Sequence, residues 1–200
     1  MLTLFLIRHG ETDTVGRSLM GWIPGCHLNP TGTAQAEKLA EKLSTYPITA
    51  IYTSPLERAV ETAAPIASRK KLQLQRSNHL GEWRPGVWEG EAITELDRLE
   101  EWRRFNAFRG GVRPAGGETM IEVQARMLRQ IECLQQQHDG QIVAAVSHAE
   151  PIRAVLAHYA GIPLDLTPRL EISPASVSVI RVDDWAPKLL CVNGTGDLAV

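Results

Sequence analysis

The sequence predicts an α/β sandwich built on a largely parallel central sheet. Two observations predict this class. Short, nearly continuous apolar runs are typical of strands that are covered on both faces, and they alternate with longer segments whose apolar residues have helical spacing. Such alternation produces a parallel sheet flanked by helices. With 200 residues, the chain is long enough for a single domain with a substantial core.

The first half of the chain is expected to contain three strands and two helices. Apolar residues at i, i+3, i+4 and i+7 predict the first helix. Ser54 at the N-cap, Pro55 at the first helical position and Glu57 at the third form a capping box, which predicts a second helix from Pro55. Pro65 should kink this helix or end it early. In order, the expected elements are strand 2–7, helix 33–44, strand 48–53, the helix from residue 55 and strand 72–76.

The second half is expected to contain three helices and three strands. The first helix is highly charged and is followed by a loop rich in glycine and proline, and the next helix is long and amphipathic. The last helix starts at about Glu150 and ends at Gly161. In order, the elements are helix 92–105, loop 109–117, helix 118–137, strand 141–147, the helix from residue 150, and strands 177–182 and 189–192.

Charged side chains follow several of the expected strands. In open α/β sheets, ligands bind beyond the carboxyl ends of the strands, and this rule selects Arg8 with His9, Arg58 and His148. Guanidinium groups match phosphate oxygens, and a neutral histidine beside such a pocket is a nucleophile for phosphorus. Glu82, in a turn rich in Trp and Gly, is the candidate proton donor, because neighbouring rings would raise its pKa.

Five ordered segments resemble the motifs of the histidine phosphatase superfamily, the phosphoglycerate-mutase-like group that also contains α-ribazole phosphatase. The resemblance covers nearly the whole chain. It implies a three-layer α/β/α sandwich with a mostly parallel central sheet, and it requires neither metal nor cofactor. The segments are LIRHGET at 6–12, TSPLERAVETA at 53–63, GEWRPGVWEG at 81–90, PAGGET at 114–119 and AVSHAEPIRAVL at 145–156.

The resemblance also implies a role for each candidate site residue. His9 is the phosphorylated nucleophile, Glu82 is the proton donor, and Arg8, Arg58 and His148 bind the phosphate. Four of these five residues are those that the strand-end rule selects without any motif.

The chain departs from the family pattern at two places. Thr14 and Val15 stand where the family often has Trp and Asn, so a frequent phosphate contact is absent. Ala149 replaces a usual glycine, and we expect its backbone still to approach the phosphate. Glu150 adds an acidic side chain that would repel highly charged substrates, which argues against a bisphosphate.

These features predict a phosphomonoesterase that acts on a small phosphorylated metabolite. Arg17 and Trp22, with Trp83, Arg84 and residues 92–110, are the candidates for contacting the leaving group. A phosphoglycerate mutase is the main alternative. A mutase must keep water away from its phosphoenzyme, which favours a long lid. In this chain, expected to form a single domain over residues 1–200, the expected insertion or lid at 84–116 is short. The other alternative is a non-catalytic module that binds phosphorylated ligands, for which a proton donor would be unnecessary.

The composition argues against two classes of partner and suggests a compartment. With a net charge of −2 and a pI of about 6.3, the protein has no overall positive potential that would attract nucleic acid or anionic lipid. No apolar run is long enough to cross a membrane. Residues 2–7 are too short for a signal peptide. The three cysteines, Cys26, Cys133 and Cys191, lack metal-like spacing, so we expect reduced thiols and a cytoplasmic location. The sequence leaves the oligomeric state open.

Overall fold

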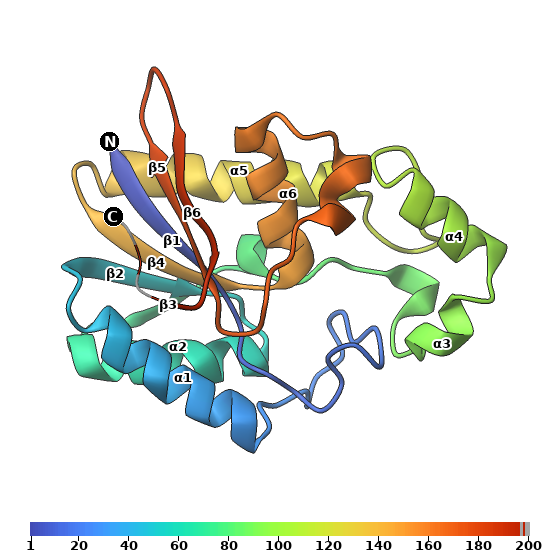
Figure 1. The fold of residues 1–200 in the computed structure, drawn as a ribbon, viewed down its shortest axis with the longest axis horizontal. Helices are drawn as coiled ribbons and strands as arrows, with labels where there is room; N and C mark the ends of the chain where they lie inside the picture. Colours follow the sequence, from blue (N-terminus) through green and yellow to red (C-terminus); the bar gives the residue numbers. More distant parts are fainter. Residues whose placement is uncertain (197, 199–200) are drawn as a thin grey trace.

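The computed structural model describes residues 1–196 and 198, and a six-stranded mixed sheet forms its centre (Figure 1). The strand order is β3-β2-β4-β1-β5-β6. Strands β3, β2, β4 and β1 are parallel, whereas β5 is antiparallel to β1 and β6 is antiparallel to β5. The strands are β1 (Leu2–Arg8), β2 (Ile48–Thr53), β3 (Leu74–Arg76), β4 (Ile142–Ser147), β5 (Val177–Val182) and β6 (Lys188–Gly194).

Helices cover both faces of the sheet, which confirms the predicted three-layer sandwich. Helices α1 (Pro30–Leu43) and α2 (Glu57–Lys70) pack on one face, and α5 (Met120–Gln137) and α6 (Ala149–Ala160) pack on the other (Figure 1). In β1, alternate side chains enter opposite cores: Leu4 packs on the α5–α6 side and Phe5 on the α1–α2 side. Burial on both faces explains why the sequence of β1 is almost entirely apolar.

The start of α2 differs from the expected capping box. The helix begins at Glu57, and its N-cap, Leu56, makes no side-chain capping bond. Ser54 Oγ instead accepts a hydrogen bond from the Leu56 N–H at 3.3 Å and lies 2.8 Å from His148 Nε2. The serine is fully buried and faces the functional edge of the sheet. A tertiary contact with His148 has therefore replaced the local cap.

Pro65 was expected to kink α2 or to end it early, and the second of these alternatives is wrong. The helix continues to Lys70. Ala63 and Ile66, on either side of the proline, are fully buried in the core shared with the sheet. Pro65 has no N–H, so one hydrogen bond of the helix is missing. The packing of these two neighbours against the sheet stabilises the helix despite this loss.

Two other helices are capped by side chains close to the expected positions. Asn29 accepts a hydrogen bond from the Gly32 N–H at 2.8 Å, and Pro30 occupies the first turn, so α1 begins three residues before position 33. Thr119 and Glu122 form a complete capping box at the start of α5. Polar N-cap side chains satisfy backbone N–H groups that have no partner within the helix.

The expected helix at 92–105 is two helices, α3 (Ile93–Leu96) and α4 (Glu100–Ala107). Asp97 caps the end of α3, and its Oδ1 accepts a hydrogen bond from the Trp102 Nε1–H at 3.0 Å. Three helical 3₁₀ segments complete the described elements: η1 (Asn78–Leu80), η2 (Gly86–Trp88) and η3 (Leu164–Arg169).

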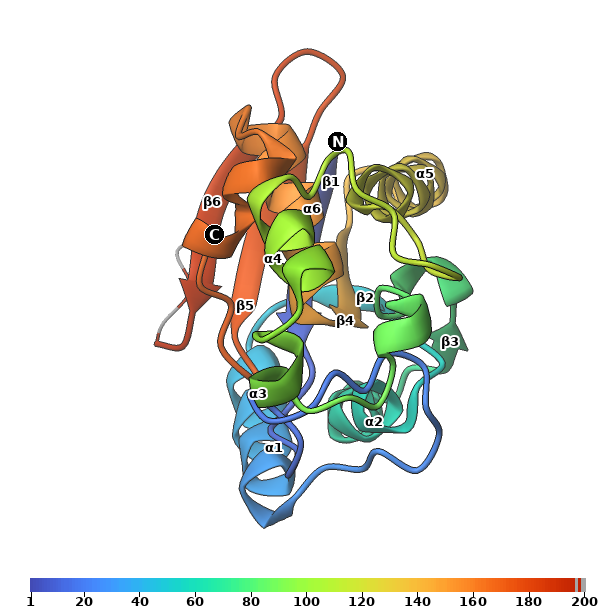
Figure 2. The same cartoon turned by 90° about the vertical axis from the view of Figure 1, so that its right-hand side faces the viewer.

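An aromatic cluster fastens the α3–α4 segment to the rest of the fold. The rings of Trp83 and Phe105 stack with centroids 4.7 Å apart, and Trp88 and Trp102 meet edge to face. The cluster also includes Met120 of α5. Figure 2 shows α3 and α4 in front of the sheet when the molecule is viewed from its right-hand side. This placement brings the segment to the functional edge, and its role as a lid remains a prediction.

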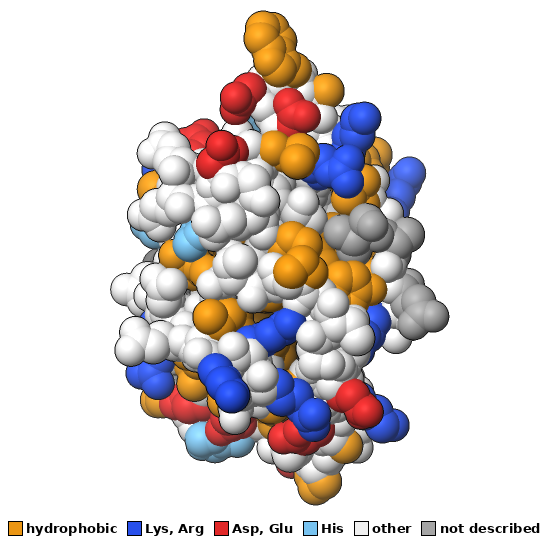
Figure 3. Space-filling view, turned by 90° about the vertical axis from the view of Figure 1, so that its left-hand side faces the viewer, with side chains coloured by type: hydrophobic (Ala, Val, Ile, Leu, Met, Phe, Trp, Pro, Cys, Tyr) orange, Lys and Arg blue, Asp and Glu red, His pale blue; other side chains and the backbone are white. Residues whose placement is uncertain are grey.

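Charged side chains of both signs are interspersed on the molecular face shown in Figure 3. No wide patch of a single sign is visible on this face. In the part of the chain that the structure describes, no helix has the length and apolar character needed to span a membrane.

Candidate active site

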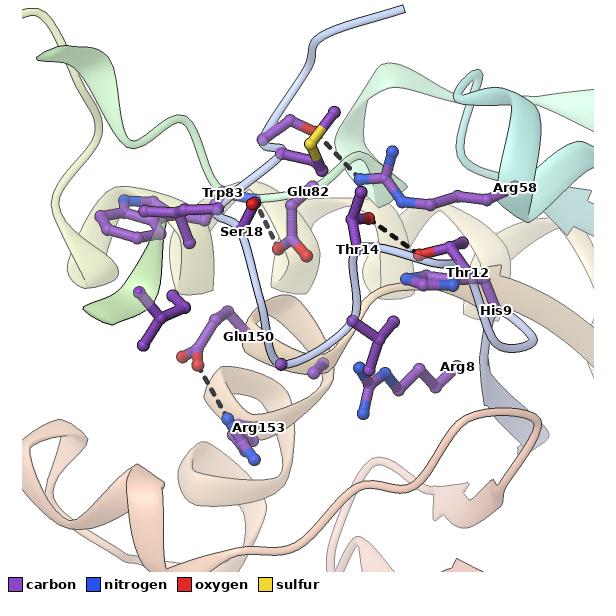
Figure 4. A pocket seen from close by; sticks show the side chains of 17 residues that line it. Arg8, His9, Thr12, Thr14, Ser18, Arg58, Glu82, Trp83, Glu150 and Arg153 are labelled. Carbon is purple, nitrogen blue, oxygen red and sulfur yellow. Dashed lines mark hydrogen bonds and ion pairs between the residues drawn. The ribbon is translucent and has the colours of Figure 1, made fainter. Parts of the chain in front are cut away.

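The carboxyl ends of β1, β2 and β4 lead to a pocket of about 270 Å³. Strand register places Arg8 opposite Ser147 and Thr53 opposite Val146, so the segments that follow these strands start side by side. Arg8, His9, Arg58 and Glu82 all line the pocket (Figure 4). His148 is fully buried next to them, and its ring centroid lies 5.1 Å from that of His9. All five predicted catalytic residues therefore meet in one place.

The His9 ring is held in one tautomer. Its Nδ1 lies 2.7 Å from the Gly10 carbonyl oxygen. Because a carbonyl oxygen can only accept a hydrogen bond, Nδ1 carries the proton and the neutral ring keeps its lone pair on Nε2. Burial, and then the positive charges of Arg58 and Arg8, hold the pKa of His9 well below 6.5. The geometry thus presents a neutral imidazole nitrogen that is able to attack.

Gly10 makes this arrangement possible because it has no side chain. Its N–H donates to Thr62 Oγ1 at 2.9 Å. A Cβ atom at this position would lie 2.7 Å from the Gly32 carbonyl oxygen, closer than real Cβ contacts allow. The glycine in the "RHG" segment is therefore required by the close approach of α1.

Three buried nitrogen atoms of these side chains have no hydrogen-bond partner among the residues that the structure describes. They are Arg8 Nε, Arg58 Nη1 and His148 Nδ1. An unsatisfied buried donor costs free energy, and positively charged donors cost the most. An anion with several oxygens, placed among these atoms, would satisfy them together.

Other bonds fix the same side chains in place. Arg8 Nη1 donates to the Ile172 carbonyl oxygen at 2.6 Å, and Arg58 Nη2 donates to the Gly21 carbonyl oxygen at 2.9 Å. His148 Nε2 is engaged with Ser54 Oγ. Burial, followed by the charge of Arg58, keeps the pKa of His148 well below 6.5. Each side chain therefore has one nitrogen bonded within the protein and a second nitrogen without a partner among the described residues.

Arg58 is not a surface ion-pair arginine. Its side chain is 3% exposed. The two neighbouring acids are bonded elsewhere: Glu57 accepts from the Gly25 N–H and Glu61 accepts from the Leu28 N–H. Among the described residues, Arg58 therefore forms no ion pair with either of these carboxylates.

Glu82 places a carboxyl group at the pocket beside the histidines. Its Oε1 accepts a hydrogen bond from the Trp83 N–H at 2.8 Å, and its Oε2 lies 3.9 Å from His148 Nδ1. Burial raises the pKa of Glu82 above 4.5, and the charge of Arg58 only partly opposes this effect. A carboxyl group with a raised pKa can carry a proton to a leaving group.

A family model described as the histidine phosphatase superfamily (branch 1) matches residues 4–195. The chain belongs to this superfamily. Phosphoserine phosphatase 1 of Hydrogenobacter thermophilus is 32% identical, with 98% of this chain and 93% of that protein covered. Probable phosphoglycerate mutase GpmB of Yersinia enterocolitica is 31% identical, with 100% and 94% covered.

A solved structure has the same fold. A mycobacterial glucosyl-3-phosphoglycerate phosphatase complexed with VO3 superimposes with a TM-score of 0.88 at 26% identity, covering 96% of this chain and 99% of that one. The protein is therefore an enzyme of the histidine phosphatase class, a class in which phosphoglycerate mutases are also members.

Two of the predicted substrate-binding residues of this phosphatase do not line its pocket. Arg17 is exposed, and its carbonyl oxygen accepts a hydrogen bond from the Ile93 N–H. Trp22 donates from Nε1 to the Glu82 carbonyl oxygen at 2.6 Å and lies under the Arg84 guanidinium, which is 3.8 Å from the ring centroid. Trp22 therefore contacts the backbone that presents Glu82 rather than the pocket.

Other residues also line the pocket of the phosphatase. Ala149, predicted as a backbone contact, does line the pocket. From the predicted leaving-group segment, Trp83 and Ile93 do so as well. Leu19 and Met20 also line the pocket, and no sequence pattern pointed to them. Within residues 1–196 and 198, no cluster of His, Cys, Asp and Glu side chains suits a metal ion.

The structure corrects the interpretation of Glu150 as an uncompensated negative charge. Its Oε1 accepts a hydrogen bond from Arg153 Nη1 at 2.8 Å, and its Oε2 accepts from Arg109 Nη1. Arg109 follows α4, 41 positions away in the sequence. Glu150 lines the pocket of the phosphatase as expected, but two guanidinium groups compensate its charge.

Arg126 of α5 is a residue that the sequence interpretation overlooked. It is buried and donates to the carbonyl oxygens of His79, Gly81 and Glu82 at 2.7, 2.9 and 3.0 Å. It also pairs with Glu118 at 3.0 Å. These bonds hold the turn that presents the proton donor of the phosphatase. One feature of the sequence could have indicated this role: Arg126 directly precedes Met127, on the side of the helix that is otherwise mostly apolar.

Proposed function

We propose that this histidine phosphatase hydrolyses a small phosphorylated metabolite through a phosphohistidine on His9, with Glu82 as the proton donor. One observation carries the proposal: buried nitrogen atoms of Arg8, Arg58 and His148, which have no partner among the described residues, belong to the same site as an imidazole whose Nδ1 is bonded to the Gly10 carbonyl oxygen. A phosphoryl group bound by these donors would lie next to the nucleophile.

In the first half-reaction, His9 Nε2 attacks phosphorus. The N–P bond forms, the ester P–O bond breaks, and the leaving oxygen takes the proton of the Glu82 carboxyl group. The raised pKa of Glu82 keeps this proton available, whereas the lowered pKa of His9 keeps its ring neutral. The alcohol leaves and the phosphoryl group remains on His9.

In the second half-reaction, water attacks the phosphohistidine. The Glu82 carboxylate accepts a proton from this water as the new O–P bond forms and the N–P bond breaks. Inorganic phosphate leaves, His9 regains its lone pair, and Glu82 is again protonated. No group outside the described site is needed to balance either step.

The start of α6 supports phosphate binding at the same point. His148 is the N-cap of this 12-residue helix and makes no side-chain capping bond. Ala149, the first helical residue, lines the pocket. Backbone N–H groups at a helix N-terminus attract anions, so the substitution of alanine for glycine retains this contribution.

A phosphoglycerate mutase is the second candidate, since the chain resembles a probable mutase over its whole length. The mutase would need priming by a bisphosphate and would pass the phosphoryl group to a second hydroxyl. Release of inorganic phosphate from p-nitrophenyl phosphate, without bisphosphate, distinguishes the two. A module that only binds phosphorylated ligands is disfavoured by Glu82, because binding requires no group that donates a proton.

The test is to trap the enzyme during turnover. A ³²P-labelled substrate, rapid quenching at alkaline pH and peptide mapping should place the label on His9. His9→Ala should lower kcat by more than roughly 10³-fold, and His158→Ala, an exposed position on α6, is the matched control. A label on another side chain, or turnover that survives His9→Ala, would reject the nucleophile.

A further inference from the structure

One peptide group orients the guanidinium group of Arg8. Arg8 Nη1 donates to the Ile172 carbonyl oxygen at 2.6 Å. The N–H of the same peptide group belongs to Ser173, and it donates to Asn193 Oδ1 at 2.7 Å. The C=O and the N–H of a trans peptide group lie in one plane and point in opposite directions, so a bond that fixes one end also fixes the other. Asn193 of β6 therefore holds the carbonyl group to which Arg8 is bonded.

An irregularity in the sheet directs Asn193 to this peptide group. Between Cys191 and Gly194, two residues of β6 lie opposite the single residue Ser178 of β5. Such a β-bulge turns a side chain away from its regular direction. Asn193 has a φ of 54°, which asparagine tolerates better than most residues. Its N–H donates to Ser178 Oγ at 3.1 Å, and its Nδ2 donates to Ser173 Oγ at 3.3 Å.

The guanidinium group of Arg58 is oriented in the same way by a different segment. Arg58 Nη2 donates to the Gly21 carbonyl oxygen at 2.9 Å. The N–H of that peptide group belongs to Trp22, and it donates to Glu89 Oε1 at 2.6 Å. Gly21 has a φ of 49°, and a Cβ atom at this position would collide with Glu89 Oε1. Glu89 therefore holds the carbonyl group to which Arg58 is bonded.

Asn193 and Glu89 have no contact with the pocket itself. Neither residue lines it, and among the described residues neither is bonded directly to Arg8 or Arg58. A guanidinium group is a rigid plane, so a bond from one nitrogen to a fixed carbonyl oxygen restricts the directions of the other nitrogens. Those include Arg8 Nε and Arg58 Nη1, which have no partner among the described residues. The two peptide groups thus determine how these nitrogens face an anion.

Loss of either side chain should weaken anion binding. A hydrogen bond to the peptide N–H polarises the carbonyl oxygen and strengthens the bond that this oxygen accepts from the arginine. Without it the peptide group can rotate, and the arginine gains orientations that it must give up when an anion binds. The loss of one hydrogen bond corresponds to a change of roughly 3- to 10-fold in an equilibrium constant.

We propose that Asn193 and Glu89 are positioning residues for the phosphate site. Each holds the N–H end of a peptide group whose carbonyl oxygen orients one of the two arginines. The inference rests on the proposed function, since it takes Arg8 and Arg58 to bind the phosphoryl group. It assigns a role in that site to two residues that lie outside the pocket.

The first experiment replaces Glu89 with and without an oxygen that can accept a hydrogen bond. Glu89→Ala removes the partner of the Trp22 N–H, whereas Glu89→Gln keeps an amide oxygen at the same distance from the backbone. The inhibition constant of orthovanadate against p-nitrophenyl phosphate should rise at least roughly 5-fold in Glu89→Ala and stay within about twofold in Glu89→Gln. Glu91→Ala, which removes an exposed carboxylate two positions away, is the matched control and should bind vanadate as the wild type does.

The second experiment separates the two bonds of the Asn193 amide. Asn193→Gly tolerates the positive φ but removes the oxygen that accepts from the Ser173 N–H. Ser173→Ala removes only the hydroxyl group that accepts from Asn193 Nδ2 and leaves the backbone bond in place. The vanadate inhibition constant should rise roughly 3- to 10-fold in Asn193→Gly and stay within about twofold in Ser173→Ala. Equal rises in both variants would contradict a role for the peptide group.

A third comparison separates the orientation of the arginines from effects on the proton donor or on stability. Because the arginines bind the phosphoryl group, kcat/KM in Glu89→Ala and Asn193→Gly should fall by the same factor for p-nitrophenyl phosphate and for phenyl phosphate, which has a poorer leaving group. A larger fall for phenyl phosphate would locate the defect at Glu82 and overturn the proposal. A lower urea midpoint with an unchanged vanadate constant would leave the residue a role in stability alone.

The two proposals fail in different ways. An unchanged vanadate constant in Glu89→Ala or in Asn193→Gly overturns the assignment of that residue and leaves the mechanism intact. The two residues belong to different segments, so each experiment decides its own residue even if the other variant fails to fold. Absence of turnover of p-nitrophenyl phosphate by the wild type, or of label on His9, would instead overturn the phosphatase mechanism.

Discussion

Replacing Arg58 with lysine tests whether this buried side chain binds phosphate or serves to stabilise the fold. Lysine keeps the positive charge but has a single charged nitrogen. In the wild-type protein Nη2 of Arg58 donates to the Gly21 carbonyl oxygen, and Nη1 has no partner among the described residues. A lysine cannot serve both the carbonyl oxygen and an anion from one fixed position, so one of the two contacts is lost.

The size of the effect follows from the number of bonds. One hydrogen bond to a charged group contributes about 1.5–3 kcal/mol, and about 1.4 kcal/mol corresponds to a tenfold change in an equilibrium constant. If the lost bond is the one to the anion, phosphate or vanadate should bind roughly 10- to 150-fold more weakly. The ligand-free protein should lose little stability, because Arg58 is paired with neither Glu57 nor Glu61.

Two measurements on the same variant decide the matter. The inhibition constant of orthovanadate against p-nitrophenyl phosphate reports anion binding, and urea unfolding without ligand reports stability. Arg69→Lys is the matched control, because Arg69 is on the same helix, is exposed and pairs with Glu37. A vanadate constant close to that of the wild type, together with a loss of more than about 3 kcal/mol of stability, would show that Arg58 is structural.

The remaining predictions concern the proton donor, the nucleophile and one helix end. Arg126→Lys should lower the rate of hydrolysis of esters with poor leaving groups roughly 10- to 100-fold, and that of p-nitrophenyl phosphate less. The reason is that the carbonyl oxygens of the Glu82 turn lose the guanidinium group that joins them. Equal losses for all esters, or the same pattern in the exposed Arg129→Lys, would contradict this. In the pH profile of kcat/KM, the acid limb should lie below pH 6.5, because the pKa of His9 is lowered and only the neutral ring attacks. The alkaline limb, set by the raised pKa of Glu82, should lie above pH 4.5 and disappear in Glu82→Gln; its persistence there would remove Glu82 as the acid. Lys71→Gly should stabilise the protein against urea by about 0.5–1 kcal/mol, since Lys71 is exposed at the end of α2 with a φ of 56°; an unchanged or lower midpoint would contradict this.

The layer architecture and the central members of the site follow from local patterns in the chain. The nearly unbroken apolar run of β1 indicates a strand that is buried on both faces. The helical spacing of apolar residues in α1 and α5 indicates that each helix packs one face against the core. Parallel strands must end at one edge, so the residues that follow them, Arg8 with His9, Arg58 and His148, are brought together by the topology alone. Each of these inferences needs only the residues of one segment and a general rule for the sheet.

The partners of individual polar side chains depend instead on contacts between distant segments. Ser54 bonds to His148 rather than capping α2, and Glu150 is compensated by Arg109, which arrives from the α3–α4 segment. Trp22 lies against the Glu82 backbone instead of the substrate pocket. A buried polar atom takes whichever partner the packed core places within bonding distance, and that distance is defined only once every layer has been assembled.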